Sequence, residues 1–271
     1  MGKFSGQIFL ITGAARGLGR DCALHLAKLG ADIGVIDINF ESFKDFGGEA
    51  SLMTAENVIE ESRNLGVRAA AATADIGNRE QVFAAFDRIV NQLGDITGVI
   101  CNAGGGMGAP DANKATEMNW DHYHAVIDRN LHGTVYTCNA VAPIMKKKKY
   151  GRIVTMGSIG GLTASSDGAY AHYGVAKAAI IHYTHYLAQE LGKYNITANC
   201  IAPGYMATGR LKELYKQAGE DTFLSRNAIK RFGKPGDVSS AVEFLLSDEA
   251  SFVSGTTLEV TGGAIGRVRV D

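Results

Sequence analysis

The chain has 271 residues, of which 46% are hydrophobic and 20% are charged, and its formal net charge at pH 7 is −1. This composition is typical of a globular protein with one large hydrophobic core. Because the charge is nearly balanced, it gives no support for binding to nucleic acid or to an anionic membrane. The sequence has no apolar run of bilayer-spanning length and does not start like a signal peptide, so we expect a cytoplasmic protein.

The cysteine and histidine residues do not indicate a metal site. The four cysteines, at positions 22, 101, 138 and 200, lie in apolar segments and form no CxxC pair. We expect them to be buried thiols that pack as small hydrophobic groups. His182 and His185 are three residues apart on a predicted helix, but they lack an accompanying carboxylate or thiol. We therefore predict no metal ligands.

Short apolar runs alternate with longer stretches of helical periodicity along the chain. The first half predicts strands at 7–12, 32–37, 67–75 and 99–102, and helices at 18–29, 54–65 and 78–93. The second half predicts strands at 152–156, 197–202 and 257–260, and helices at 119–147, 170–193 and 237–246. Pro143 could bend the first of these helices. Residues 205–234 are expected to be irregular, with helical pieces.

Strands separated by helix-length segments are typical of parallel βαβ units. Right-handed crossovers then place helices on both faces of the sheet. We therefore predict an α/β fold with a single doubly wound, Rossmann-like parallel sheet. Since no linker rich in proline or serine divides the chain, residues 1–271 are expected to form one domain.

The first predicted strand runs directly into a glycine-rich turn, with the sequence TGAARGLG at residues 12–19. Glycine allows a tight turn and lets the backbone approach a pyrophosphate closely. The N–H groups at the start of the following helix favour the phosphate charge. Because this turn links a strand to a helix, and the next strand ends in an acid, the context predicts nucleotide binding.

Asp37 is the acid that ends the second predicted strand. Its carboxylate can accept hydrogen bonds from both hydroxyls of the adenosine ribose, and it would repel a 2′-phosphate. It therefore favours NAD over NADP as the cofactor. Arg16 in the glycine-rich turn could offset part of this repulsion. The alternative interpretation of Asp37 is a solvated acid at a strand end.

A tyrosine and a lysine in one predicted helix are candidates for proton transfer. Tyr173 and Lys177 are four residues apart, so their side chains share a helix face and can reach one pocket. A free phenol has a pKa of about 10, and a nearby ammonium would stabilise its phenolate form. Tyr170 is a rival tyrosine, but Gly174 occupies the position where its lysine would be needed. Ser158 ends the preceding strand, at the sheet edge where ligands bind.

Together these features resemble the short-chain dehydrogenase/reductase family over essentially the full length of the chain. The matching motifs occur in the family's order. They are TGxxxGxG at residues 12–19, Asp75-Ile76, Asn102-Ala103-Gly104, Asn130, Ser158, Tyr173-xxx-Lys177, and Pro203-Gly204 with Thr208 downstream.

The resemblance implies that Asn130, Ser158, Tyr173 and Lys177 form a catalytic tetrad. In this scheme Tyr173 exchanges a proton with the substrate oxygen, and Ser158 hydrogen-bonds that oxygen. Lys177 holds the nicotinamide ribose and lowers the tyrosine pKa, and Asn130 supports a water-mediated proton relay. The residues implied to bind NAD are Gly13, Arg16, Gly17, Leu18, Gly19, Asp37, Asp75, Ile76, Asn102, Ala103, Gly104, Tyr173, Lys177, Pro203, Gly204, Met206 and Thr208.

Three features depart from the family pattern. Cys101 replaces an asparagine that is common at this position, which we expect to be tolerated. Tyr173 lies 15 residues after Ser158, a longer interval than usual, so the loop at 164–171 beside the substrate has extra residues. Residues 38–55 form an insertion after the second strand. It is either a surface excursion or an element like that of relatives that hold NAD tightly.

The leading interpretation is an NAD(H)-dependent enzyme that interconverts a secondary alcohol and a ketone. The substrate is expected to be a compact cyclic or apolar small molecule. The alternatives are a 3-oxoacyl-thioester reductase, acting on coenzyme A or acyl carrier protein derivatives, and a catalytically silent NAD-binding regulator. Relatives commonly pair the two long helices of the second half, so we expect a homotetramer ahead of a dimer.

A substrate-covering segment is expected at about 204–234. It contains apolar side chains, and residues 205–234 have seven Lys or Arg against three Asp or Glu. This excess could steer an anionic substrate, or it could be the solvated faces of helices. On the other side, His172 and the three glycines at 104–106 are expected to leave room near the nicotinamide.

Overall fold

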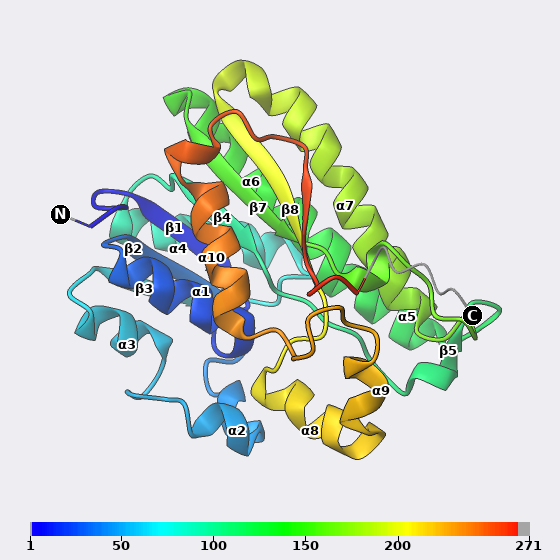
Figure 1. The fold of residues 1–271 in the computed structure, drawn as a ribbon. Helices are drawn as coiled ribbons and strands as arrows, with labels where there is room; N and C mark the ends of the chain where they lie inside the picture. The colour runs from blue at the N-terminus through cyan, green and yellow to red at the C-terminus, as the bar shows by residue number, and fades with distance from the viewer. Residues whose placement is uncertain (1, 265–271) are drawn as a thin grey trace.

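In the computed structural model, which describes residues 2–264, a parallel sheet lies between two layers of helices (Figure 1). The strands are β1 (Ile8–Thr12), β2 (Asp32–Asp37), β3 (Ala69–Thr73), β4 (Gly98–Cys101), β5 (Asn113–Lys114), β6 (Glu117–Met118), β7 (Gly151–Met156), β8 (Ile196–Pro203) and β9 (Thr257–Val260). The helices are α1 (Gly17–Lys28), α2 (Gly47–Ala50), α3 (Val58–Asn64), α4 (Arg79–Leu93), α5 (Trp120–Ile127), α6 (Gly133–Lys148), α7 (Ala171–Leu191), α8 (Gly209–Ala218), α9 (Glu220–Leu224) and α10 (Pro235–Leu246).

The main sheet has seven strands in the order β3-β2-β1-β4-β7-β8-β9, and neighbouring strands are parallel. The chain moves outward from β1 through β2 to β3, and then returns to pair β4 with the other side of β1. The strand order therefore reverses between β1 and β4, which is where a doubly wound sheet opens a crevice for ligands. The predicted fold is confirmed.

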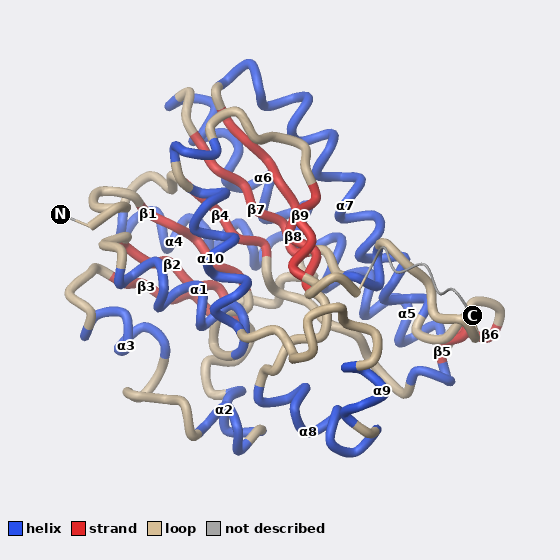
Figure 2. The backbone as a smooth tube through the Cα atoms, viewed as in Figure 1, coloured by secondary structure: helices blue, strands red, loops and turns tan. Residues whose placement is uncertain are grey.

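Helices cover both faces of the sheet, so most strand residues are buried. On one face α1, α3 and α10 pack against a core that includes Phe9 and Val242. On the other face α4, α6 and α7 pack against a core that includes Leu10 and Ile89 (Figure 2). All four cysteines are free and buried, as expected. Within residues 2–264, no helix is both long and apolar enough to cross a bilayer, and no cluster of His, Cys, Asp or Glu could hold a metal ion.

Asparagine side chains determine where three helices begin. The side chain of Asn57 accepts hydrogen bonds from two backbone N–H groups, at 3.0 and 3.2 Å, and α3 therefore begins at Val58. Asn78 and Asn119 cap α4 and α5 in the same way, each within one residue of the predicted start. The prediction of a helix over 54–65 was wrong in its first four residues, because the cap follows them.

The long helix predicted over 119–147 is present from Trp120 to Lys148, with Pro143 inside it. The prediction missed the π-helical turn at Asp128–His132, which separates α5 from α6. The small hairpin of β5 and β6 was not predicted, because two-residue strands have no measurable alternation. The expected helical pieces within 205–234 are α8 and α9.

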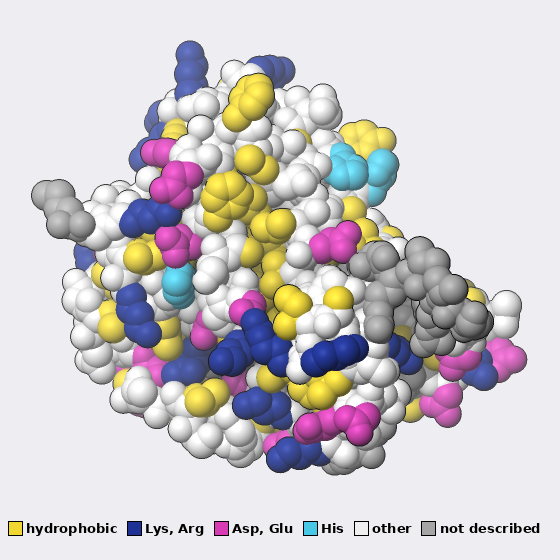
Figure 3. All heavy atoms as spheres, in the orientation of Figure 1, with side chains coloured by type: hydrophobic (Ala, Val, Ile, Leu, Met, Phe, Trp, Pro, Cys, Tyr) yellow, Lys and Arg dark blue, Asp and Glu magenta, His cyan; other side chains and the backbone are white. Residues whose placement is uncertain are grey.

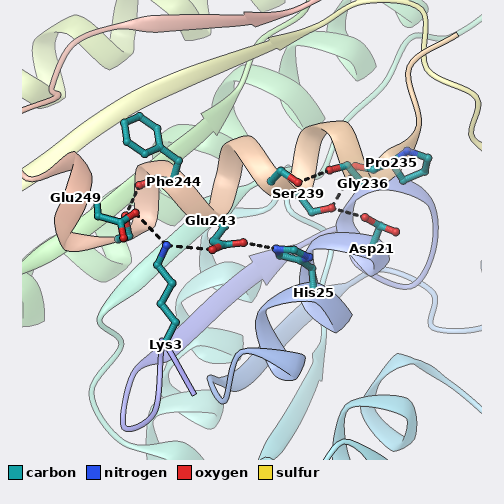
Figure 4. A network of polar contacts seen from close by, with 11 residues as sticks. Lys3, Asp21, His25, Pro235, Gly236, Ser239, Glu243, Phe244 and Glu249 are labelled. Carbon is teal, nitrogen blue, oxygen red and sulfur yellow. Dashed lines mark hydrogen bonds and ion pairs between the residues drawn. The ribbon is translucent and has the colours of Figure 1, made fainter. Parts of the chain in front are cut away.

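A polar network fastens α1 to α10 and to the N-terminal segment (Figure 4). The Glu243 carboxylate contacts Lys3 Nζ at 3.0 Å and His25 Nε2 at 2.7 Å, and the hydroxyl of Ser239 donates to Asp21. The hydrogen bond to His25 holds the pKa of the Glu243 carboxyl below its usual value. This network fixes α1, whose first residues belong to the glycine-rich turn.

Candidate active site

A cleft of about 1810 Å³ runs along the carboxyl ends of the strands. Asp37 and Ile76 line one end of it, and Ser158 and Tyr173 line the other. Gly13, which follows β1 at the point where the strand order reverses, also lines the cleft. All the residues predicted to bind the cofactor or to act in catalysis line this cleft, except Gly19 and Asn130.

The glycine-rich turn packs backbone against backbone. Gly13 has a φ of 68°, and a Cβ atom there would lie 2.7 Å from the Cα atom of Ala103. A Cβ on Gly19 would lie 2.9 Å from the Cα atom of Ala14, so Gly19 acts through packing. Asn102 lines the cleft, but its Nδ2 donates to the Gly13 carbonyl at 2.8 Å. Its side chain therefore supports the turn itself.

Asp37 lies at the end of β2, beside this turn. Its carboxylate accepts hydrogen bonds from the backbone N–H groups of Ala15 at 2.9 Å and Asn39 at 3.1 Å. The guanidinium of Arg16 lies over the Phe46 ring, 4.7 Å from the ring centroid. The insertion at 38–55 thus engages the cation that could have offset the charge of Asp37.

Sequence reasoning missed a buried carboxylate in this insertion. Glu49 in α2 is 3% exposed and accepts hydrogen bonds from the backbone N–H groups of Gly17 at 3.2 Å and Gly209 at 2.7 Å. Gly17 begins α1 and Gly209 begins α8, so one carboxylate interacts with the N-termini of two helices. A Cβ on Gly48 would lie 3.3 Å from the Gly209 Cα atom. The insertion therefore bridges the glycine-rich turn and the covering segment.

Ser158 and Tyr173 lie together at the other end of the cleft. A Cβ built on Gly160 would be 3.7 Å from the Ser158 Oγ atom and 3.8 Å from the Tyr173 ring. Ser158 follows β7, and its hydroxyl accepts a hydrogen bond from the Gly160 N–H at 3.2 Å. Tyr173 lies in the first turn of α7. The ends of a strand and a helix thus bring together two residues that are 15 positions apart.

Lys177 lies one turn further along α7 and is buried. Its Nζ donates to the Met156 carbonyl at 2.8 Å and is 5.6 Å from the centroid of the Tyr173 ring. Burial disfavours the charged ammonium and lowers the pKa of Lys177 from its ordinary value to about 8. The lysine therefore lies close to the Tyr173 ring, as expected for two residues on one helix face.

The π-helical turn places Asn130 behind the cleft. The fully buried Asn130 side chain donates to the carbonyls of Val126 at 2.7 Å and Gly105 at 3.0 Å, and it accepts from the Gly105 N–H at 3.0 Å. A Cβ on Gly104 would collide with Asn130 Oδ1 and lie 3.5 Å from Lys177 Nζ. Asn130 therefore holds the glycine backbone that faces the lysine. Such π turns are frequent at functional sites.

Aromatic side chains dominate the segment that covers the cleft. The Phe223 ring lies 5.3 Å from that of Tyr205 and 4.8 Å from that of Tyr215, which in turn stacks on Phe232 at 4.5 Å. Tyr205, Tyr215 and Phe223 line the cleft. This end of the cleft is therefore suited to an apolar ring or short chain.

Lys and Arg side chains gather over the covering segment (Figure 3). Several of these cations have partners within the chain. Arg231 pairs with Asp237 of α10 at 2.6 Å, and Lys230 donates to the Asn227 carbonyl at 2.7 Å. Arg226 donates to the hydroxyl of Tyr205 at 3.0 Å. The acid that pairs with Arg231 lies just outside the segment, so the local charge excess overstates the attraction for an anionic substrate.

The opposite wall matches the expectation of open space only in part, because the three glycines at 104–106 line the cleft but His172 does not. His172 is fully buried, and its Nε2 is hydrogen-bonded to the Met107 carbonyl at 2.9 Å, so it does not border the cleft. A Cβ on Gly106 would overlap the hydroxyl of Tyr170. The space above Gly106 is therefore filled by a tyrosine ring that the sequence did not place there.

Known proteins share this whole architecture. A family model described as "Enoyl-(Acyl carrier protein) reductase" matches residues 13–264. A cyclohexanol dehydrogenase from Rhodococcus sp. (strain TK6) is 44% identical over 258 residues, which cover 95% of this chain and 96% of that protein. A 3-oxoacyl-[acyl-carrier-protein] reductase from Pseudomonas aeruginosa is 33% identical, with 96% of this chain and 98% of that protein covered.

A solved structure is similar over the same length. It is a 3-oxoacyl-[acyl-carrier protein] reductase with bound NAD from Brucella melitensis, with a TM-score of 0.82, 33% identity, and 96% of this chain and 92% of that chain covered. The fold, the cleft and these similarities define a Rossmann-like oxidoreductase. The chain belongs to the short-chain dehydrogenase/reductase family.

The lowered pKa of Lys177 leads to a testable pH dependence. If the charged ammonium holds the nicotinamide ribose, NADH should bind most tightly below pH 8 and more weakly as Lys177 loses its proton above that pH. For one essential proton, the Kd should rise by a factor approaching ~10 per pH unit. Calorimetric titration between pH 6 and 10 would measure it. In Lys177→Met, binding should be weaker and should lack this pH dependence; a flat profile in the unsubstituted chain would contradict the assignment.

Proposed function

We propose that this chain is an NAD(H)-dependent dehydrogenase that interconverts compact cyclic secondary alcohols and their ketones in the cytoplasm. The observation that carries the proposal is the meeting of Ser158, Tyr173 and Lys177 at an end of the cleft covered by aromatic rings. The similarity to a cyclohexanol dehydrogenase over 95% of this chain supports an alicyclic substrate.

The residues along the cleft fit a nicotinamide adenine dinucleotide. The Gly17 N–H at the start of α1 already donates to Glu49, so the pyrophosphate would use the remaining N–H groups of this helix N-terminus, and Asp37 would bind the adenosine ribose. When bound, NAD would supply the hydride acceptor, and NADH the hydride donor, for the carbinol carbon. The remaining proposed contacts are Gly13, Arg16, Gly17, Leu18, Gly19, Asp75, Ile76, Asn102, Ala103, Gly104, Tyr173, Lys177, Pro203, Gly204, Met206 and Thr208.

The chain's own side chains would handle the proton and the substrate oxygen. During alcohol oxidation the Tyr173 phenolate takes the hydroxyl proton, and during ketone reduction the phenol returns it. Ser158 donates a hydrogen bond to the same oxygen and keeps it beside Tyr173. The Lys177 ammonium stabilises the phenolate. Asn130 fixes the Gly105 backbone, and by resemblance to the family it supports the water relay that carries the proton to solvent.

A second candidate function is the reduction of 3-oxoacyl thioesters. It is favoured by the 33% identity to acyl-carrier-protein reductases and by the basic residues of the covering segment. A catalytically silent regulator is disfavoured because Tyr173 and Lys177 are both present and both line the cleft.

A substrate panel tests the proposed function against this alternative. NAD(H)-dependent turnover of cyclohexanol and cyclohexanone should have a kcat/KM at least ~10-fold above that of 3-hydroxybutyryl- and 3-oxobutyryl-coenzyme A, in the matching directions. The kcat/KM for cyclohexanol and cyclohexanone should also be insensitive to salt. A higher efficiency with the thioesters that falls as salt is added would favour the acyl reductase. Turnover of neither class would overturn the substrate assignment.

The role of Tyr173 is tested by removing its hydroxyl. Tyr173→Phe should lower kcat by ~10²-fold or more, because the proton acceptor is lost, while the Kd of NADH stays within ~3-fold. Tyr194→Phe is a matched control, because Tyr194 lies just beyond the far end of α7 and does not line the cleft. Near-normal turnover in Tyr173→Phe would contradict the assignment of Tyr173 as the proton-transfer group.

Asp37 is expected to determine cofactor choice. The unsubstituted chain should use NAD at least ~100-fold more efficiently than NADP, because a 2′-phosphate would meet the carboxylate. Asp37→Ser should narrow this preference, whereas Asp32→Ser at the start of the same strand should not. The measurement is kcat/KM with each cofactor at a saturating alcohol concentration. Comparable efficiency with both cofactors in the unsubstituted chain would show that Arg16 outweighs Asp37.

We further propose a homotetramer paired through the helices of the second half. Trp120 on α5 and Tyr186 on α7 are each 66% exposed, which supports a partner surface on these helices. Light scattering at micromolar concentration would measure the assembly, and a monomer would contradict this proposal.

A further inference from the structure

Tyr170 has a backbone conformation that aromatic residues rarely adopt. It precedes α7 with φ 61° and ψ 27°, in the left-handed region. Within residues 2–264, the other non-glycine residues with positive φ are Lys149 and Asn195, and both follow the last residue of a helix. The left-handed conformation is common there. Tyr170 instead lies at the start of a helix, beside the catalytic end of the cleft, and strained residues cluster at such sites.

Hydrogen bonds on both sides hold this conformation. The Tyr170 carbonyl accepts from the backbone N–H groups of Tyr173 and Gly174, each at 3.2 Å, so the residue is built into the first turn of α7. On the other side, the Ser165 hydroxyl donates to the Ala169 carbonyl at 2.8 Å. Tyr170 therefore ends the loop that is longer than usual in the family, and the loop and the helix together fix its direction.

The ring of Tyr170 lies beside the ring of Tyr173. Its centroid is 5.4 Å from that of Tyr173 and 5.0 Å from that of His172, which it meets edge to face. Because the His172 ring is buried and bonded to the Met107 carbonyl, it supports Tyr170 from behind. The phenol extends over Gly106, where a Cβ would overlap its hydroxyl. Tyr170 thus occupies space beside Tyr173 that a smaller residue would leave to the substrate.

The aromatic cluster of the covering segment also limits this end of the cleft. Tyr215 is 4% exposed and is held between Phe223 and Phe232, so this wall has little room to move. Tyr215 lies close enough to Tyr173 to interact with it electrostatically, and the Tyr170 ring contacts the Tyr173 ring. An alcohol whose oxygen lies at Tyr173 would therefore meet both this cluster and the Tyr170 ring. Two packed aromatic walls set a size limit on the group attached to the carbinol carbon.

We propose that Tyr170 determines the size of the alcohol, by admitting one alicyclic ring and excluding fused rings. This inference rests on the proposed function, because it takes the alcohol oxygen to lie at Tyr173. Removal of the Tyr170 ring opens the space above Gly106, and a second ring of the substrate can then fill it.

The test compares cyclohexanol with decahydro-2-naphthol, a secondary alcohol that has a second fused ring. In Tyr170→Ala, the ratio of kcat/KM for the bicyclic alcohol to that for cyclohexanol should rise at least ~10-fold. Tyr170→Phe is the matched control: it keeps the ring and should keep this ratio within ~3-fold of that of the unsubstituted chain. Thermal melting and NADH titration would establish that each variant is folded and binds cofactor.

The outcomes separate this inference from the proposed function. If the unsubstituted chain oxidises cyclohexanol but the ratio does not change in Tyr170→Ala, the role of Tyr170 is overturned while the proposed function stands. If neither chain oxidises an alicyclic alcohol, both are overturned. A raised ratio in Tyr170→Phe as well would assign the selectivity to the hydroxyl and overturn the role of the ring.

A second pair of variants tests where the ring lies, and it stays informative if Tyr170→Ala is unstable. Gly106→Ala should lower kcat/KM for cyclohexanol at least ~10-fold, because the new methyl group displaces the Tyr170 ring. When Gly106→Ala is added to Tyr170→Ala, kcat/KM for cyclohexanol should change by less than ~3-fold relative to Tyr170→Ala alone. If the fold-change in kcat/KM of the double variant equals the product of the fold-changes of the two single variants, the two residues do not compete for this space.

Discussion

The site depends on the close packing of the glycine-rich turn after β1 against the turn that follows β4. Gly13 approaches the Ala103 backbone so closely that no side chain fits between them, and the Thr12 hydroxyl accepts from the N–H groups of Asn102 and Ala103, each at 3.1 Å. These contacts lie where the strand order reverses, so they hold together the two halves of the sheet at the cleft. The two ends of the cleft, with Asp37 at one and Tyr173 at the other, keep their relative positions through this junction.

Local periodicity and motif order were sufficient to predict the sheet, most of its helices and the residues that line the cleft. The features that sequence analysis missed depend on contacts between distant segments. Glu49 lies in a four-residue helix without an apolar stripe, and its two hydrogen bonds reach Gly17 and Gly209. The π-helical turn at Asn130 is stabilised by the Gly105 backbone, which a 3.6-residue period cannot reveal. Tyr170 was considered only as a rival base, because its ring position depends on a glycine 64 residues earlier.

The burial of the Lys177 ammonium carries a cost in folding free energy. The pKa of Lys177 is lowered from 10.5 to about 8, so an ammonium buried at neutral pH destabilises the fold by about 3 kcal/mol. Because the unfolded chain holds this proton more strongly, the penalty is fully present below pH 8. It is relieved as pH rises toward 10.5. The same desolvation strengthens the action of the charge on nearby groups.

The two hydrophobic cores, one on each face of the sheet, support different parts of the cleft. Met206 anchors the start of the covering segment in the core beneath α1, α3 and α10, whereas Leu187 and Leu191 anchor α7 in the core on the opposite face. The covering segment and α7 thus pack in different hydrophobic cores, on opposite faces of the sheet. Substitutions that loosen one core can therefore move the covering segment over the cleft while α7 keeps Tyr173 and Lys177 aligned, so one wall of the cleft can diverge without disturbing the other.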